Sequence, residues 1–191
     1  MRSTHTTSPR IAPVEPPYHP DLAKTLAQWM PPGADVEPLK LFRTIAVHPG
    51  LFTRMRPLGS AILSKGIVPP REREIVLHRT CARAGAGYEW GVHAVAFAPA
   101  VGLTEEQIVA TAQGDADDPA WSDERDRLLV RLADELYDTA TLSDELYEQL
   151  AAEWSDAELL ELVAITGFYR LISSIVNVAR VEPEPWARPT G

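Results

Sequence analysis

The chain has 191 residues, 45% of them hydrophobic, which is enough to bury one core without disulfide bonds or metal ions. Its formal net charge of −9 lacks the clustered lysine and arginine that phosphate binding needs, so we exclude nucleic acid as a partner. The one cysteine, Cys81, excludes a disulfide within these residues and favours a reducing, cytoplasmic location.

The two ends of the chain differ in composition from its middle. Residues 1–19 and 181–191 contain recurrent prolines and no periodic apolar face, so we predict flexible tails around a single all-helical domain at residues 20–180. Residues 1–20 contain no signal-peptide core, and no uninterrupted apolar run approaches the ~18 residues that span a bilayer. We therefore predict no membrane partner.

The first half of the domain reads as a series of short helices. Helical spacing predicts helices at Asp21–Met30, with a stop at residues 31–33, and at Pro38–Val47. A third helix is predicted over Leu51–Leu63, and Pro57 should kink or split it near Arg56 because proline removes a backbone donor. These helices precede the more informative middle of the chain.

The middle of the chain predicts a helical hairpin. Pro69 and Pro70 favour a helix start, the acidic first turn suits the helix dipole, and the helix should end near Arg83. Residues 85–87 (Gly-Ala-Gly) break it, and the next helix should cover residues 88–97. The side chains of the two helices should therefore meet.

The second half contains clear helix starts and no convincing strand. Thr104 with Gln107 and Ser155 with Glu158 form capping boxes, and Ser143 can cap the helix that follows it. Apolar periodicity predicts helices over 121–137, 144–154 and 159–178. The fold class is therefore all-α, and a faint similarity between residues 68–76 and 153–163 leaves open a duplicated helical unit.

Glu89 and His93 are the first candidates for chemistry. They are four residues apart, so on a helix they lie on one face within reach of each other. A carboxylate beside an imidazole fixes the ring tautomer and raises its basicity, which leaves the other nitrogen free to move a proton. The alternative is a surface or interface ion pair that only supports the helix.

Glu74 can join this pair if the hairpin forms. It lies on the preceding helix, and a carboxylate held between helices would have a shifted pKa. The alternative is an ion pair with Arg71 or Arg79. Glu74 and His78 are also four residues apart, so two Glu-x-x-x-His pairs could form a metal site, although neither the di-iron nor the zincin spacing is present. We predict no metal and a structural role for His78.

Side chains that could bind a substrate are less well defined. Tyr88 and Trp90 flank Glu89 and could line a pocket, although aromatic residues at a helix start more often pack in a core or interface. Guanidinium groups bind carboxylates through two parallel hydrogen bonds, and the candidates are Arg43, Arg54, Arg56, Arg71 and Arg73. We include Arg43 and Arg71 in the predicted site, but the spacing does not choose among the five. Cys81 should pack in the core.

Four segments, in their order and spacing, resemble the carboxymuconolactone decarboxylase and alkylhydroperoxidase D superfamily. They are residues 41–49, residues 70–76, the Tyr88-Glu89-Trp90 triplet with His93, and residues 102–108. The resemblance covers roughly residues 38–180. It implies a compact, all-helical fold of the alkylhydroperoxidase D type and self-association into a homo-oligomer.

The resemblance also indicates which chemistry this chain has lost. The redox branch has a glutamate, a Cys-x-x-Cys pair and a histidine, and these positions fall on Glu74, Ala86, Glu89 and His93. Both redox cysteines are therefore missing, and reduction of peroxides by a dithiol is chemically excluded within this chain.

The decarboxylase branch needs no dithiol, so the resemblance implies a lyase, a decarboxylase or isomerase, without a cofactor. Its substrate would be a small carboxylated lactone or unsaturated acid, with His93, Glu89 and Glu74 as the catalytic group. Two alternatives stay open: a non-catalytic binding or scaffold protein that lost the cysteines, and a metalloenzyme that uses the Glu/His pairs.

Overall fold

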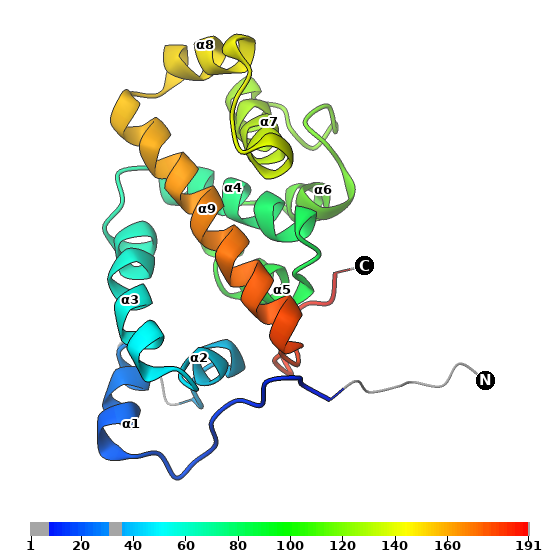
Figure 1. The fold of residues 1–191 in the computed structure, drawn as a ribbon. Helices are drawn as coiled ribbons and strands as arrows, with labels where there is room; N and C mark the ends of the chain where they lie inside the picture. Colours follow the sequence, from blue (N-terminus) through cyan, green and yellow to red (C-terminus); the bar gives the residue numbers. More distant parts are fainter. Residues whose placement is uncertain (1–7, 31–35, 191) are drawn as a thin grey trace, which may run out of the picture.

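The computed structural model describes residues 8–30 and 36–190, and within them it contains helices and no strand (Figure 1). This confirms the all-α prediction. In chain order the elements are α1 (Pro20–Ala27), α2 (Lys40–Ile45), α3 (Pro49–Ser64), α4 (Pro70–Arg83), α5 (Gly87–Ala96), the short 3-10 helix η1 (Pro99–Val101), α6 (Glu105–Gln113), α7 (Glu124–Thr139), α8 (Asp144–Glu153) and α9 (Asp156–Ala179).

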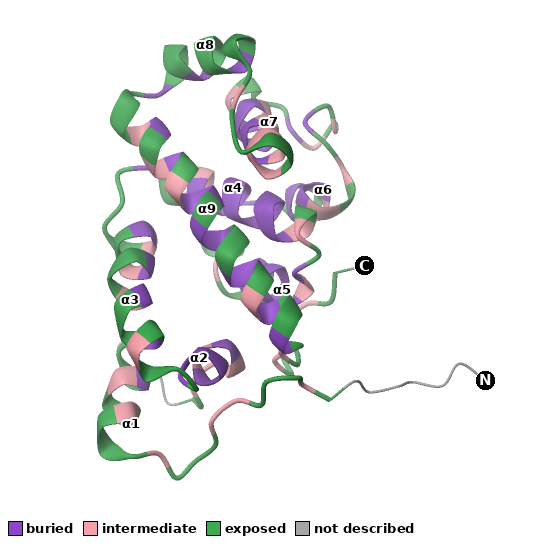
Figure 2. Cartoon of the chain, viewed as in Figure 1, coloured by how far each residue is buried: buried purple, intermediate pink, exposed green. Residues whose placement is uncertain are grey.

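Helix α4 is the centre of the fold. Every residue from Arg73 to Cys81 is buried, and the helix packs against α5, α6, α7 and α9. Figure 2 shows α4 almost entirely in the colour of buried residues, whereas α9 and α3 are exposed on one side. A buried helix with this many charged residues is stable only if each charge has a partner inside the fold. The partners of α4 therefore define the candidate site.

The predicted capping residues of three helices are confirmed. Thr104 with Gln107 and Ser155 with Glu158 form complete capping boxes at α6 and α9. The side chain of Ser143 accepts a hydrogen bond from the backbone N–H of Leu146 at the start of α8. These local signals are strong because each capping side chain satisfies a backbone donor that the helix itself leaves free.

Several details of the predicted helices differ from the structure: α7 begins at Glu124 rather than at residue 121, and α2 covers Lys40–Ile45 rather than Pro38–Val47. The split considered at Pro57 is wrong, because α3 continues through it from Pro49 to Ser64, while the kink considered near Arg56 stays a prediction. Pro57 lies on the exposed side of α3, where water can solvate the carbonyl left without a partner, while Phe52 and Ile62 hold the other side in the core. Helix α1 ends at Ala27 rather than Met30, and the predicted stop at residues 31–33 lies outside the described residues.

Both terminal segments contact the helices. The backbone N–H of Arg10 donates to the carbonyl oxygen of Ala179, and the backbone N–H of Arg188 donates to that of Gly91. The described helices run from Pro20 to Ala179. The division into a domain at 20–180 with two flexible tails stays a prediction.

Helix α9 is long and apolar enough, by length and composition alone, to cross a membrane. Its most apolar stretch has a mean hydropathy of 1.6, and half of that stretch is buried inside the fold. A core helix of a globular domain has this pattern, since its inner face is apolar for packing reasons.

Candidate functional site

The hairpin of α4 and α5 brings Glu74 and His93 together. A tight turn joins the helices, with Gly85 at a positive φ of 62°, a conformation that costs glycine little. The side chain of His93 then points back at α4, and its Nδ1 lies 2.9 Å from Oε2 of Glu74. Glu74 is 0% exposed and His93 is 3% exposed. The predicted convergence of these two residues is therefore present in the structure.

Glu89 lies on the other side of the His93 ring. Its Oε1 is 3.5 Å from Nε2 of His93, as expected for residues four apart on one helix face. Glu89 is only 6% exposed, so this is not the surface ion pair considered as the alternative. Its second oxygen, Oε2, is buried and has no hydrogen-bond partner among the described residues. Oε1 of Glu89 thus lies beside the imidazole, while Oε2 of the same carboxylate is buried without a hydrogen-bond partner.

The two carboxylates determine the charge of His93. Burial alone would lower the pKa of His93, but the charge and hydrogen bond of Glu74, with a further contribution from Glu89, outweigh it and raise the pKa to about 9. Burial would raise the pKa of Glu74, yet His93, His78 and Arg73 together lower it. At neutral pH the site therefore contains an ionised Glu74 and a buried imidazolium.

Aromatic rings enclose the imidazolium. Phe97, half-buried at the end of α5, stacks on His93 with ring centroids 4.5 Å apart, and Tyr169 of α9 presents an edge at 5.5 Å. A cation over an aromatic face gains electrostatic energy when water is excluded. Sequence patterns do not identify these two residues, because apolar spacing on a helix gives the same signal for any core position.

His78 has a different role from His93. Its Nδ1 lies 2.7 Å from the backbone carbonyl oxygen of Glu74, and its side chain is completely buried. Burial, with the nearby charge of His93 adding to it, lowers the pKa of His78 to about 4. His78 is therefore neutral at pH 7 and packs its ring against Trp90, with centroids 6.1 Å apart. Both observations fit the predicted structural role.

Arg73 is the arginine that contacts this cluster. Its Nε and one terminal nitrogen lie 3.4 and 3.5 Å from Oε1 of Glu74, and its other terminal nitrogen donates to the carbonyl oxygen of Leu63 at 3.1 Å. Glu74 thus contacts His93 through one carboxylate oxygen, Oε2, and Arg73 through the other, Oε1. The contacts with Glu74 are long, at the limit of hydrogen bonding, so they constrain the guanidinium weakly.

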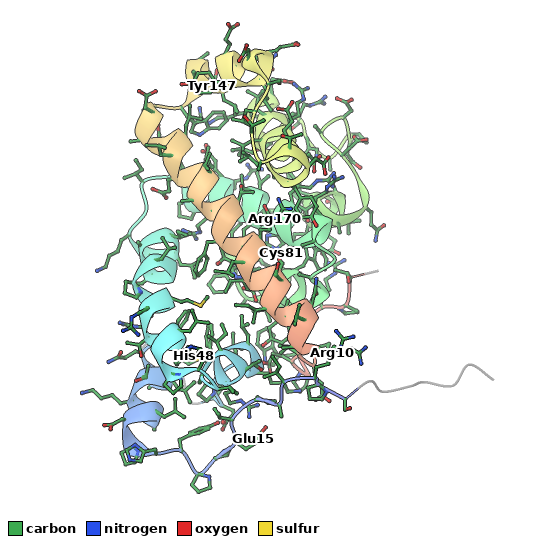
Figure 3. All side chains as sticks on the ribbon, in the orientation of Figure 1. Arg10, Glu15, His48, Cys81, Tyr147 and Arg170 are labelled. Carbon is green, nitrogen blue, oxygen red and sulfur yellow. The ribbon has the colours of Figure 1, made fainter. Side chains whose placement is uncertain are left out.

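The other predicted site residues lie elsewhere. Arg43 forms an ion pair with Glu15 (labelled in Figure 3) at 2.6 Å, and Arg71 donates to both oxygens of Asp126, at 2.7 Å for Oδ2. The structure does not bring either guanidinium to His93. Each instead joins helix α2 or α4 to another part of the fold.

The polar groups of the two aromatic candidates also have partners other than His93. The Tyr88 hydroxyl donates to Glu184 at 2.6 Å, and burial raises its pKa far above the ordinary value. The indole N–H of Trp90 donates to the hydroxyl of Thr111 at 2.9 Å. These residues fix α5 against the C-terminal segment and α6. Their predicted role in substrate binding stays a prediction.

Cys81 packs in the core, as predicted. It is completely buried on α4, in the interior of the molecule (Figure 3), and burial raises the pKa of its thiol well above the ordinary value. A thiol in this environment stays protonated at neutral pH and is a poor nucleophile. Within the described residues, no group of three or more His, Cys, Asp or Glu side chains is arranged to hold a metal ion.

Comparison with known proteins agrees with this architecture. Residues 49–133 match the Carboxymuconolactone decarboxylase family, and this range contains Glu74, Glu89 and His93. No curated protein matches the chain significantly by sequence.

Several solved structures are similar in fold, among them two of a debrominase and one of a protein of unknown function. A debrominase, Bmp8, in a cysteine-to-alanine variant bound to 2,3,4-tribromopyrrole, superposes with a TM-score of 0.77 at 15% identity and 94% coverage of both chains. Its apo form gives 0.75 at 15% identity and 93% coverage of both. A protein of unknown function from Agrobacterium tumefaciens, described in connection with the antioxidant defence protein AhpD, gives 0.66 at 20% identity, covering 73% of this chain and 94% of that one.

At these identities the structural likeness concerns the fold, while the family match comes from the sequence itself. The sequence contains one cysteine, Cys81, which is buried on α4 and occupies neither position of a redox pair, since those positions are Ala86 and Glu89. By its sequence the segment 49–133 belongs to the Carboxymuconolactone decarboxylase family, and the chain, with one cysteine, contains no Cys-x-x-Cys pair.

Proposed function

We propose that this protein is a cofactor-independent acid/base lyase that acts on a small carboxylated lactone or unsaturated acid. The observation that carries the proposal is the buried imidazolium of His93, held between Glu74 and Glu89 with its pKa raised to about 9. A group of this kind carries a proton at neutral pH in a site from which water is largely excluded. It is suited to donate that proton to a carbanion or enolate as it forms.

The two nitrogens of His93 have separate roles in this proposal. Nδ1 is held by Glu74 at 2.9 Å, which fixes the ring orientation. Nε2 has only the 3.5 Å contact with Glu89, which is too long for a strong hydrogen bond. The proton on Nε2 is therefore the one available to a substrate, and the free oxygen of Glu89 can return a proton afterwards.

Arg73 is the best candidate for the group that anchors the substrate carboxylate. Arg43 and Arg71 are engaged by Glu15 and Asp126 through short contacts. Arg73 shares Glu74 with His93 and has long contacts to it, so it can exchange one of them for a substrate carboxylate.

The decarboxylation step balances without a cofactor. The bond between the carboxylate carbon and the ring carbon breaks, CO2 leaves, and the electron pair moves into the conjugated carbonyl group to give a dienolate. His93 then transfers its Nε2 proton to the carbon of the dienolate and becomes neutral. A proton from water, passed through Glu89, restores the imidazolium.

The test is turnover of a panel of carboxylated lactones and unsaturated acids, followed by CO2 release and by the loss of the conjugated chromophore. His93→Gln should abolish turnover, and Glu89→Gln should reduce it by about 10²–10⁴-fold. His19→Gln, which changes an exposed histidine outside the site, should leave it unchanged. Turnover that survives His93→Gln, or a full panel with no turnover, would contradict the proposal.

The same purified protein and panel of compounds also test two alternative functions. A binding protein would hold members of the panel without turnover, and equilibrium dialysis would detect this. A metalloenzyme would contain stoichiometric metal after purification without a histidine tag. We include 2,3,4-tribromopyrrole in the panel because that compound is bound in one structure of similar fold.

A further inference from the structure

Helices α4, α5 and α9 pack on one another (Figure 1), and they carry buried polar atoms that have no hydrogen-bond partner. The described part of the chain has five such side-chain atoms, and three belong to these helices: His78 Nε2, Glu89 Oε2 and Ser173 Oγ. Folded proteins pair nearly all of their buried polar atoms, and an exception is often a group that binds or reacts. Three exceptions in one part of the core therefore point to further chemistry beside His93.

Glu89 is the one of these three residues that contacts the proton-donating nitrogen of His93. Its Oε1 is 3.5 Å from Nε2 of His93, while its Oε2 is buried and unpaired. His78 lies on the other side, with its Nδ1 3.6 Å from Glu74, the residue that contacts Nδ1 of His93. Ser173 carries a neutral hydroxyl, which is a poor proton acceptor. A base and an acid therefore lie side by side on one face of α5, in Glu89 and His93.

The decarboxylation proposed above uses Glu89 only to pass on a proton. His93 gives its proton to the dienolate, and each turnover takes one proton from water. A reaction that removes one proton from the substrate and adds another uses the acid and the base together, and it takes no proton from water. Keto–enol interconversion is a reaction of this kind, because the enol hydroxyl loses a proton while the neighbouring carbon gains one. The adjacent acid and base on α5 match its requirements.

We propose that this site also interconverts the enol and keto forms of a 2-oxo acid, with Glu89 as the base for the enol hydroxyl and His93 as the acid for the neighbouring carbon. Three groups define the substrate class: Arg73 can bind a carboxylate, Oε2 of Glu89 can accept from a hydroxyl, and Nε2 of His93 can protonate a carbon. The enol of a 2-oxo acid is the smallest molecule that presents all three features on adjacent carbons. The inference rests on the acid/base role proposed for His93 and not on the release of CO2.

The proton transfers balance without a cofactor. The O–H bond of the enol breaks, its proton goes to Oε2 of Glu89, and its electron pair becomes the second bond of the ketone. The electron pair of the C=C bond forms a new C–H bond with the proton from Nε2 of His93. The carboxyl group of Glu89 then rotates and returns its proton to Nε2, which lies 3.5 Å from that carboxylate. Both groups regain their starting states, and the reverse sequence enolises the 2-oxo acid.

The surroundings of His93 suit a flat, conjugated molecule. The ring of Phe97 stacks on the imidazole with a centroid distance of 4.5 Å, and the ring of Tyr169 lies at 5.5 Å. Aromatic rings offer flat apolar contact area to an enol, whose double bond and carboxylate are conjugated. His93 is 3% exposed, so little water competes for the proton that it carries.

The test is ketonisation of the enols of phenylpyruvate and of oxaloacetate, which persist long enough in water to be added in the enol form. Loss of the conjugated ultraviolet absorbance gives the rate, and the protein should ketonise at least one of them faster than buffer does. In D2O the site should deliver deuterium to one face of the enol, so NMR should show one C3 configuration in excess, whereas buffer gives both equally. No acceleration for either enol, or equal configurations in an accelerated reaction, would overturn the proposal.

Glu89→Gln tests the base separately from the acid. The change removes the proton acceptor and keeps the size of the side chain, so kcat for ketonisation should fall by about 10²–10⁴-fold while KM changes by less than about threefold. His93→Gln should remove the acceleration. Glu148→Gln is the matched control, because Glu148 is exposed on α8 and outside the site, and it should leave the rate unchanged. Ketonisation by Glu89→Gln at the wild-type rate would contradict the proposal, and if that variant fails to fold, the C3 configuration produced by the wild type decides.

Release of CO2 from the carboxylated lactones is measured separately, which distinguishes this inference from the proposed lyase. Release of CO2 without ketonisation of either enol would remove this inference and leave the lyase. Ketonisation with one C3 configuration in excess, but without CO2 from any member of the panel, would remove the lyase and support this inference.

Discussion

Replacing Glu74 by Gln tests the electrostatic account of the site directly. In the wild type the pKa of His93 is about 9, above its ordinary value of 6.5, because Glu74 and Glu89 outweigh burial. A raised pKa means that the imidazolium stabilises the folded state fully below pH 6.5, and that this contribution is lost as the pH rises through about 9. The difference between these two pKa values corresponds to a contribution of about 3 kcal/mol to the free energy of unfolding.

Glu74→Gln removes the larger of the two attractive contributions and leaves the ring buried. The pKa of His93 should then fall by about 1–3 pH units, since an adjacent opposite charge shifts a pKa by that much. The variant should lose about 3 kcal/mol of folding free energy at pH 6 relative to wild type. At pH 9.5 His93 is largely neutral in both proteins, and the loss should shrink to about 1 kcal/mol from the contact with Arg73.

Two measurements check this. Histidine ring NMR follows the pKa of His93 in both proteins. Urea unfolding at several pH values gives the difference in unfolding free energy between them. The contributions of other buried titratable groups, such as Cys81, are the same in both proteins and cancel in this difference. Glu72→Gln is the control, because Glu72 also lies on α4 but pairs with Arg125 at 2.8 Å and leaves His93 untouched. A Glu74→Gln penalty that is the same at pH 6 and pH 9.5, or a His93 that titrates near 6.5 in the wild type, would refute the reasoning.

Three other substitutions test contacts that hold the helices around the site in place. For each, chemical unfolding measures the change in the free energy of unfolding. Arg71→Leu should cost about 3–5 kcal/mol because it leaves Asp126, 4% exposed, without its bidentate partner, and an effect below 1 kcal/mol would contradict this. Gly91→Ala should lower the free energy of unfolding by about 1–3 kcal/mol, because a Cβ there overlaps the carbonyl oxygen of Arg188. If this overlap is the cause, truncating the chain before residue 188 should remove the penalty. Ser155→Ala should cost about 1 kcal/mol through the lost cap of α9, and Ser155→Thr should recover most of it.

The local features of this fold were predictable because they depend on neighbours in sequence. The capping residues Thr104 and Ser155 and the turn at Gly85 are signals of this type, and each is present in the structure. The split considered at Pro57 was wrong for the same reason, because the local effect of proline is real but its exposure to water, which makes it tolerable within α3, is a tertiary property.

The candidate site was partly predictable. The spacing of Glu89 and His93 places them on one helix face, and the hairpin brings Glu74 to them, so the sequence by itself determined this triad. The sequence also determined the match to the family and the absence of a dithiol, because both depend only on the identity and order of the residues.

Only the tertiary structure decided what surrounds the triad and which charge it carries. Burial and the distances to two carboxylates set the pKa of His93, and neither can be read from a linear chain. The same holds for the choice of arginine: Arg43 and Arg71 find carboxylates far away in the sequence, and Arg73 is left beside Glu74. Long-range pairing is settled by how helices pack, since any of several guanidinium groups satisfies the local pattern equally well.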